Sequence, residues 1–284
     1  MPIIAIVNPK GGSGKSTLAT HLAGHAASLG LAVMLGDLDR QKSTLVWLHR
    51  RAQERLARHA PVTSWVVDPK RTLRPPSGVT HVVLDTPAGL GGLELARVLM
   101  TADAILMPVC ASAFDRDVAA SCWAELAAHP RVASGRCRVA VVGMRIDART
   151  RAELGLRAWA EQVGADFLGV LRDTQTYVRC VERGLTIFDL PPARTQADRE
   201  QWLPLLEWLG PLLGHAELAA LTQPGALAEL ARAAAEPREV QRVALQRSTP
   251  RPTIGDLAAA LRPAAAHPAP SRWLPRAWWP WARA

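Results

Sequence analysis

A glycine-rich segment near the N-terminus constrains the fold of this chain more than any other part of the sequence. It reads NPKGGSGKST over residues 8–17, follows the apolar run Ile3–Val7 and opens the amphipathic stretch Ser16–Leu29. A strand, a glycine-rich loop and a helix in this order form a phosphate-binding loop, because glycines let backbone amides surround phosphate oxygens. We therefore expect an α/β domain that binds a nucleoside triphosphate.

The side chains of this loop have separate expected roles. Lys15 places a cation against the β- and γ-phosphates, and the hydroxyl of Ser16 is a ligand for Mg²⁺. The alternative is a glycine-rich turn with a chance Lys-Ser pair, which the strand, the spacing and the following helix together disfavour. The predicted nucleotide-binding residues are Lys10, Gly11, Gly12, Ser13, Gly14, Lys15, Ser16 and Thr17.

Short apolar runs alternate with longer amphipathic stretches over residues 1–213, and this alternation predicts a doubly wound, mostly parallel sheet flanked by helices. The runs contain few charges, as strands covered on both faces should. The predicted strands are Ile3–Val7, Ala32–Gly36, Ser64–Val67, His81–Leu84, Ala104–Pro108, Val139–Gly143 and Phe167–Leu171. The predicted helices are Ser16–Leu29, Ser43–His59, Gly92–Thr101, Asp115–His129, Arg149–Val163 and Asp198–Leu213.

The composition changes after the last predicted helix, where Ala, Pro and Arg dominate and strand-like runs end. We expect a nucleotide-binding domain over residues 1–213 and a largely helical or disordered extension over residues 214–284. Short helices are predicted at Glu217–Ala235 and after Thr253. The extension ends in SRWLPRAWWPWARA, in which tryptophans stand among arginines.

Composition narrows the compartment and the partners. No apolar run approaches the roughly 20 residues of a membrane span, and the N-terminal sequence does not have the form of a signal peptide. We therefore expect a cytoplasmic protein. Lys and Arg exceed Asp and Glu by 34 to 25, a net charge of +9, which favours partners such as nucleic acid or an anionic membrane. A coding bias towards arginine is the alternative source of this charge.

The phosphate loop departs from the usual pattern at its start. Pro9 stands where the first glycine is common, and Lys10 adds a second lysine. The string KGGSGKST resembles the deviant Walker A motif of the ParA/MinD family of P-loop ATPases, and the chain is most similar to the short ParA type. The resemblance implies that Lys10 reaches across a two-fold interface to the nucleotide of a second subunit. A solvated loop lysine is the alternative for Lys10.

A second segment, LGDLDRQKST at residues 35–44, resembles the family's D-L-D-P-Q segment, with Arg40 in place of proline. The resemblance implies that Asp39 positions the attacking water and that Asp37 is its companion nearer the sheet. A carboxylate there can orient water without being a strong base, because phosphoryl transfer depends mainly on positioning and charge neutralisation. A turn or helix N-cap pair is the alternative for both aspartates.

A third segment, HVVLDTPAGL at residues 81–90, is an apolar strand that ends in an acid, the form of a Walker B segment. Asp85 would hold Mg²⁺ through a water molecule, and Pro87–Gly89 would form a switch that senses the γ-phosphate. A strand-terminal cap is the alternative for Asp85. Family members often carry an asparagine where this chain has Met144 and Arg145, so the family alone implies ATP rather than GTP.

The resemblance also implies a function. ParA-like proteins dimerise on ATP binding, bind nucleoid DNA without sequence preference, and leave it when a ParB-like or cargo-adaptor protein stimulates slow ATP hydrolysis. We therefore expect a nucleoid-associated homodimer that uses ATP and Mg²⁺ to position a plasmid, a chromosome or a protein complex. The expected catalytic residues are Lys10, Lys15 and Asp39.

Clustered arginines in the second half of the domain suit contacts to DNA phosphates. The candidates are Arg145, Arg149, Arg151, Arg172, Arg179, Arg183 and Arg194. Arg172, Arg179 and Arg183 flank one segment, and the last two lie four residues apart, hence on one face if that segment is helical. A solvated or salt-bridged helix face is the alternative for each arginine.

Two other classes of function stay open. A MinD-like spatial regulator would bind a membrane, and the tail residues Trp273, Trp278, Trp279 and Trp281 would suit an anionic lipid surface, although prolines interrupt any helix there. A partner-docking or core-packing tail and a disordered tail are the other interpretations. A metal-loading enzyme of the same superfamily would be expected to carry a CxxC pair, which the sequence lacks.

Overall fold

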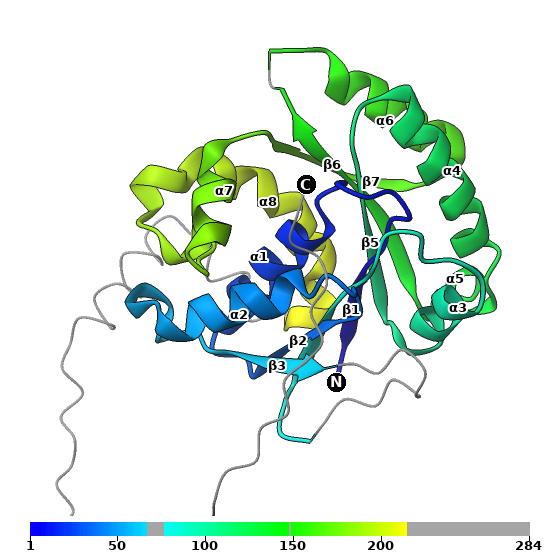
Figure 1. Ribbon diagram of the computed structural model, residues 1–284. Helices are drawn as coiled ribbons and strands as arrows, with labels where there is room; N and C mark the ends of the chain where they lie inside the picture. The colour runs from blue at the N-terminus through cyan, green and yellow to red at the C-terminus, as the bar shows by residue number, and fades with distance from the viewer. Residues whose placement is uncertain (67–76, 148, 215–284) are drawn as a thin grey trace, which may run out of the picture. The chain divides into compact units, whose positions relative to one another are not determined.

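The computed structural model describes residues 1–66, 77–147 and 149–214 of the chain. The strands in these residues form one parallel sheet of seven strands in the order β3-β2-β4-β1-β5-β6-β7 (Figure 1). They are β1 Ile3–Ile6, β2 Val33–Asp37, β3 Val62–Val66, β4 His81–Asp85, β5 Ala104–Val109, β6 Arg138–Ile146 and β7 Asp166–Arg172. The seven predicted strands and the doubly wound parallel fold are confirmed.

Helices cover both faces of this sheet. They are α1 Lys15–Ser28, α2 Ser43–Gln53, α3 Gly92–Thr101, α4 Ala113–Ala127, α5 Pro130–Ala133, α6 Ala152–Val163, α7 Gln175–Glu182 and α8 Pro192–Leu213. Two short 3-10 turns, η1 Arg55–Ala57 and η2 Ile187–Asp189, follow α2 and α7. In Figure 1, α1, α2, α7 and α8 lie on one face of the sheet, and α3, α4 and α6 lie on the other.

Two hydrophobic cores follow from the alternation of side chains along the strands. In β1, Ile4 and Ile6 pack in the core under α1, whereas Ile3 and Ala5 pack in the core on the opposite face. A parallel strand that is covered on both faces therefore needs apolar residues at every position. Because β1 is held from both sides, the glycine-rich loop that follows it begins at a fixed point on the carboxyl edge of the sheet.

Some helix bounds differ from those predicted. α2 ends at Gln53 and not at His59, because Glu54 takes an extended backbone conformation and a 3-10 turn follows. α8 begins at Pro192 and not at Asp198, since proline fits the first turn of a helix, where its missing N–H is not needed. α7 was not among the predicted helices. Arg179 and Arg183 were expected to share a face only if their segment were helical, and the structure has a helix there.

The described residues end at Gly214, directly after α8. The predicted extension at residues 215–284, with its two short helices and its tryptophan-rich end, lies outside them. In the described part of the chain, none of the helices has the length and apolar character that a membrane span needs.

A buried ion pair ties α2 to the segment before α8. The guanidinium of Arg51 donates to both carboxylate oxygens of Asp189 at 2.9 and 3.0 Å, and the two side chains are 3% and 0% exposed. Arg51 also donates to the carbonyls of Ala60 and Gly184. Gly184 has φ 72°, and a Cβ there would lie 2.2 Å from the backbone nitrogen of Arg51. This bidentate pair therefore fixes how α7 and η2 pack beside α2.

Replacing Arg51 should destabilise the fold strongly. Arg51→Met leaves the Asp189 carboxylate buried without its partner, and we expect the free energy of unfolding to fall by about 3–5 kcal/mol. Denaturant titration measures this change. Arg50→Met, at the exposed neighbouring position of α2, is the matched control and should change stability by less than about 0.5 kcal/mol. Equal effects of the two substitutions would contradict the assigned role of the pair.

Candidate functional site

Asn8 fixes the start of the phosphate loop. Its side chain is 1% exposed, its amide nitrogen donates to the Pro108 carbonyl at 2.7 Å, and its Oδ1 accepts from the Lys10 N–H at 2.8 Å. The loop is thus anchored to β5 before it turns. Asn8 was not among the predicted site residues, although its place between a buried strand and a glycine-rich loop was a usable signal.

The turn into α1 requires glycine at position 14. Gly14 has φ 94°, in the left-handed region, and a Cβ there would lie 2.7 Å from the Cε of Met144. α1 begins at the next residue, Lys15. The first N–H groups of a helix have no intrahelical acceptor and attract anions, so the loop and the helix start together have the geometry to hold a phosphate.

The two lysines of the loop point in different directions. Lys15 is 7% exposed, and its Nζ donates to the Lys10 carbonyl at 3.0 Å. Burial lowers the pKa of the Lys15 ammonium, while the charges of Asp85 and Asp39 raise it. The side chain of Lys10 leaves the loop, and its Nζ lies 2.5 Å from an oxygen of Asp115 in α4. Lys15 therefore faces its own loop, whereas Lys10 does not.

Asp85 lies at the centre of the carboxyl edge of the sheet. Parallel pairing places it opposite Ile6 of β1 and Asp37 of β2. It is fully buried, and neither of its carboxylate oxygens has a hydrogen-bond partner among the described residues. Burial raises the pKa of the Asp85 carboxyl to about 7, while the nearby Ser16 hydroxyl opposes the shift without a hydrogen bond of good geometry.

A divalent cation fits this arrangement. A buried carboxylate without a partner is costly, and Mg²⁺ held by the Ser16 hydroxyl and, through water, by Asp85 would compensate its charge. The described residues contain no group of three or more His, Cys, Asp and Glu side chains that could hold a metal on its own. Phosphate oxygens and water would therefore have to complete the coordination shell.

Asp37 and Asp39 differ in their surroundings. The Asp37 carboxylate is fully buried, accepts from the Thr44 hydroxyl at 2.7 Å and from the Asp39 N–H at 2.9 Å. It therefore holds the start of α2 and the loop that carries Asp39, which is the capping role left open as an alternative. The Asp39 carboxylate accepts only from the Gln41 N–H among the hydrogen bonds found in the described chain, so one of its oxygens stays available.

A cavity of about 390 Å³ joins Asp39 to the predicted switch segment. Pro87 and Ala88 line it together with Asp39. The switch is also bonded to the phosphate loop, because the Gly89 N–H donates to the Pro9 carbonyl at 2.6 Å. This hydrogen bond joins the phosphate loop to the segment that lines the cavity with Asp39.

A second cavity, of about 430 Å³, borders the loop on its other side. Gly14 and Thr17 form one wall, and Met144, Arg145 and Tyr177 contribute to the others. Its volume lies in the range of pockets that hold small ligands. The base and sugar of a nucleotide whose phosphates lay in the loop would enter this cavity.

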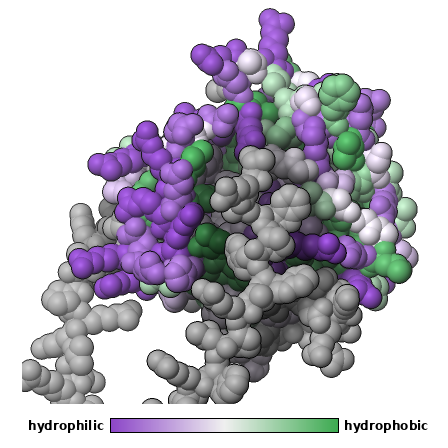
Figure 2. Space-filling view, in the orientation of Figure 1, coloured by the Kyte–Doolittle hydropathy of each residue, from purple (hydrophilic) through white to green (hydrophobic). Residues whose placement is uncertain are grey.

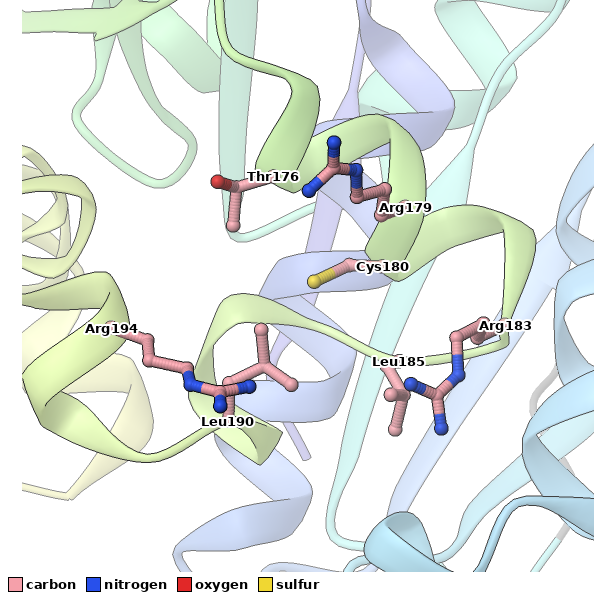
Figure 3. A pocket seen from close by; sticks show the side chains of 7 residues that line it. All are labelled: Thr176, Arg179, Cys180, Arg183, Leu185, Leu190 and Arg194. Atoms are coloured by element: carbon pink, nitrogen blue, oxygen red, sulfur yellow. The ribbon is translucent and has the colours of Figure 1, made fainter.

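Two of the arginines proposed for DNA contacts do lie on one face. Arg179 and Arg183 line a pocket of about 300 Å³, together with Arg194 (Figure 3). The pocket is also lined by Thr176, Cys180, Leu185 and Leu190. Figure 2 shows hydrophilic residues gathered on the side of the molecule where α7 lies in Figure 1. The pocket therefore combines three arginines with apolar side chains.

Ion pairs distinguish these arginines. Arg172 donates to Asp198 at 2.6 Å, and Arg183 donates to Glu54 at 2.8 Å, so the salt-bridged alternative describes both side chains. Arg179 has no ion pair within the described residues. Neither pairing was visible in the sequence, because the partners lie 26 and 129 positions apart.

Two buried histidines lie on α1 behind the phosphate loop. The Nδ1 of His21 lies 2.9 Å from the Thr17 carbonyl, which can only accept, so Nδ1 carries the proton. The Nε2 atoms of His21 and His25 have no hydrogen-bond partner in the described part of the chain. The rings of Trp202 and Phe188 lie 6.0 Å from His21 and 4.4 Å from His25, respectively. Burial lowers the pKa of both imidazoles to about 4.

Comparison with known proteins agrees with this geometry. Residues 4–187, well over half of the chain, match the model of the CobQ/CobB/MinD/ParA nucleotide binding domain. The chain is 29% identical over 189 residues to the maintenance of carboxysome distribution protein A of Gloeobacter kilaueensis, which covers 65% of this chain and 83% of that protein. It is 24% identical over 171 residues to the protein ParA of Rhizobium radiobacter, with 59% and 76% covered.

A solved structure shares the fold. Apo McdA from Cyanothece has a TM-score of 0.60 and 15% sequence identity, and the match covers 74% of this chain and 100% of that chain. The arrangement of sheet, loop and helices is therefore common to both molecules.

The buried histidines predict a loss of stability in mild acid. An imidazole with an ordinary pKa of 6.5 when unfolded and about 4 when folded takes up its proton more readily in the unfolded chain. Each ring should therefore lower the free energy of unfolding by on the order of 3 kcal/mol as pH drops from about 6.5 to about 4. Protonation of Asp85, whose pKa is raised to about 7 in the fold, opposes part of this loss. Urea titrations at several pH values measure this dependence.

Substitution identifies the groups responsible. His25→Gln should reduce by about one the number of protons that the chain takes up on unfolding, which sets the slope of the unfolding free energy against pH. His49→Gln, at an exposed position of α2, should leave this slope unchanged. A pH dependence that survives substitution of both His21 and His25 would show that other groups cause it.

Proposed function

Since this chain belongs to the CobQ/CobB/MinD/ParA family, whose ParA and MinD members are ATPases, we propose that it is a ParA-type positioning ATPase. In this proposal the chain binds ATP, forms a sandwich dimer, binds nucleoid DNA without sequence preference and positions a cargo. A partner protein then releases it from DNA by stimulating its slow ATP hydrolysis.

The proposal rests mainly on the different directions in which the side chains of the two loop lysines point. Lys15 turns into its own loop, where its ammonium would meet the β- and γ-phosphates. The side chain of Lys10 is 36% exposed and turns away from that loop towards α4. A lysine in this position suits a nucleotide held by a second subunit, and a two-fold axis would make the exchange of Lys10 reciprocal.

The other residues have roles that fit phosphoryl transfer. Ser16 and Asp85 would hold Mg²⁺, which neutralises charge on the phosphoryl group as it is transferred. Asp39 would orient the attacking water, because one carboxylate oxygen stays available and faces the cavity that Pro87 and Ala88 also line. The hydrogen bond between Gly89 and Pro9 would couple the switch to the phosphates.

The DNA contacts would come from the arginines that keep their charge uncompensated. Arg179 and Arg194 line the same pocket and have no ion pair among the described residues, whereas Arg172 and Arg183 are paired with carboxylates. We therefore assign the main phosphate contacts to Arg179 and Arg194. Arg172 and Arg183 would contribute less, because the carboxylates of Asp198 and Glu54 compensate their charge.

The nature of the cargo follows only from relatives. One relative is named for the maintenance of carboxysome distribution, and another is named ParA. In this proposal the chain acts in the cytoplasm, where it associates with the nucleoid. A ParB-like protein or a cargo adaptor is its activating partner. A plasmid, a chromosome or a protein assembly is the cargo in this proposal.

Binding to random-sequence DNA tests the proposal. Purified protein should bind DNA with ATP and not with ADP, and the affinity should fall steeply as salt rises, because lysine and arginine contacts to phosphates release counterions. Lys15→Ala should not bind DNA with either nucleotide. ATP-dependent binding to anionic liposomes without DNA binding would contradict the proposal and indicate a MinD-like regulator.

The pocket arginines have a separate expected effect. The double variant Arg179→Ala/Arg194→Ala should weaken DNA binding and lower the slope of log affinity against log salt by about 2, one for each lost phosphate contact. Arg58→Ala/Arg136→Ala removes the same charge from exposed positions outside the pocket and should keep the slope. An equal change in both double variants would refute the assignment of the pocket.

A further inference from the structure

The contact between Lys10 and Asp115 is an ion pair that is partly shielded from water. The Nζ of Lys10 lies 2.5 Å from the Oδ1 of Asp115, and the two side chains are 36% and 13% exposed. A charge pair in such a position interacts more strongly than a pair at an open surface, because the effective dielectric constant is lower. The pair therefore holds the Lys10 side chain against α4 in the single subunit.

Asp115 is itself held in place. The hydroxyl of Ser112 donates to its Oδ2, and the Asp115 N–H donates to the Ser112 Oγ at 3.1 Å. Desolvation raises the pKa of the Asp115 carboxyl, but the hydrogen bonds from Lys10 and Ser112 outweigh it and lower the pKa overall. Asp115 also lies in the first turn of α4, where the helix dipole favours a negative charge. The carboxylate is therefore charged and oriented before any second subunit arrives.

The backbone of Lys10 is fixed as well. Its N–H donates to the Asn8 side chain, and its carbonyl accepts from the Lys15 ammonium. Only the four-carbon stem of Lys10 can move without breaking the phosphate loop. A change in the position of the Lys10 ammonium therefore means breaking its contact with Asp115.

We propose that Asp115 is a positioning residue for Lys10, which it retains in its own subunit until a second, ATP-bound subunit competes for the ammonium. The inference rests on the proposed role of Lys10 across the dimer interface. In this proposal the ammonium, which lies 2.5 Å from Asp115 in its own subunit, leaves that contact as it moves to a phosphate in the other subunit. The strength of the pair thus sets the protein concentration at which the dimer forms.

The surface beside the pair is suited to a second copy of the chain. Phe114, next to Asp115 in α4, is 79% exposed. Gly11 and Gly12 of the phosphate loop are also exposed, and the ion pair draws loop and helix together. A subunit that approaches Lys10 would cover the Phe114 ring, and this burial would offset part of the energy needed to separate Lys10 from Asp115.

Asp115→Asn tests the inference, because it removes the charge but keeps an amide oxygen that can accept from Ser112. The dimer fraction is measured by sedimentation with ATP over a series of protein concentrations, together with the ATPase rate. The concentration at half-maximal dimer should fall roughly three- to tenfold. Asp117→Asn, with the same charge change at an exposed position of α4, should leave it unchanged, and Asp115→Glu should restore it to near the original value.

Two further readouts separate a positioning role from a structural one. Asp115→Asn should no longer change the concentration at half-maximal dimer when Lys10 is also replaced by Ala. An effect of Asp115→Asn on the stability of α4 would persist in the Lys10→Ala protein. An unchanged or raised half-dimer concentration in Asp115→Asn would overturn the inference, as would an equal shift in Asp117→Asn. The affinity for a fluorescent ATP analogue, measured at protein concentrations too low for dimers to form, tests the proposed function separately from the role of Asp115. Without ATP binding both proposals fall, and with ATP binding but no shift only the role of Asp115 falls.

Discussion

The parallel register that places β4 between β1 and β2 is the constraint on which the site depends. Ile6 at the end of β1 and Asp37 at the end of β2 both stand opposite Asp85. The phosphate loop, the segment that carries Asp39 and the acidic end of β4 therefore meet at one edge of the sheet. A slip of one residue would turn Ile4 and Ile6 to the opposite face, so the two hydrophobic cores enforce the geometry of the site.

Buried charges in this fold fall into two groups. Arg51 is fully satisfied by a bidentate carboxylate and two carbonyls, and Asp37 accepts from the side chain and backbone of Thr44, so both stabilise the packing of α2. Asp85 and Lys15 are buried at the site with far fewer partners. A buried charge without a partner destabilises the fold when no ligand is bound. The same charges would be compensated when a phosphate chain and a cation bind beside them.

The sequence predicted those parts of the structure that depend on local pattern. Apolar runs located every strand, and Asp85 was found because it stands directly after such a run. Asp39 was found through the resemblance of the segment LGDLDRQKST to a family motif. The contact between Lys10 and Asp115 joins residues about a hundred positions apart, and only the folded sheet brings β1 and β5 side by side. The same reason hid the pairing of Arg183, which the sequence could present only as one of several arginines.

The exchange of Lys10 between subunits is the central claim, and a mixing experiment tests it most directly. Lys10→Ala and Asp39→Ala should each lack ATPase activity when assayed alone. In a mixed dimer, the subunit that carries Lys10→Ala keeps its own Asp39 and would receive Lys10 from the Asp39→Ala subunit, so one site is complete. Mixing the two inactive proteins should restore ATP hydrolysis. A mixture no more active than the sum of its components, although mixed dimers form, would contradict it.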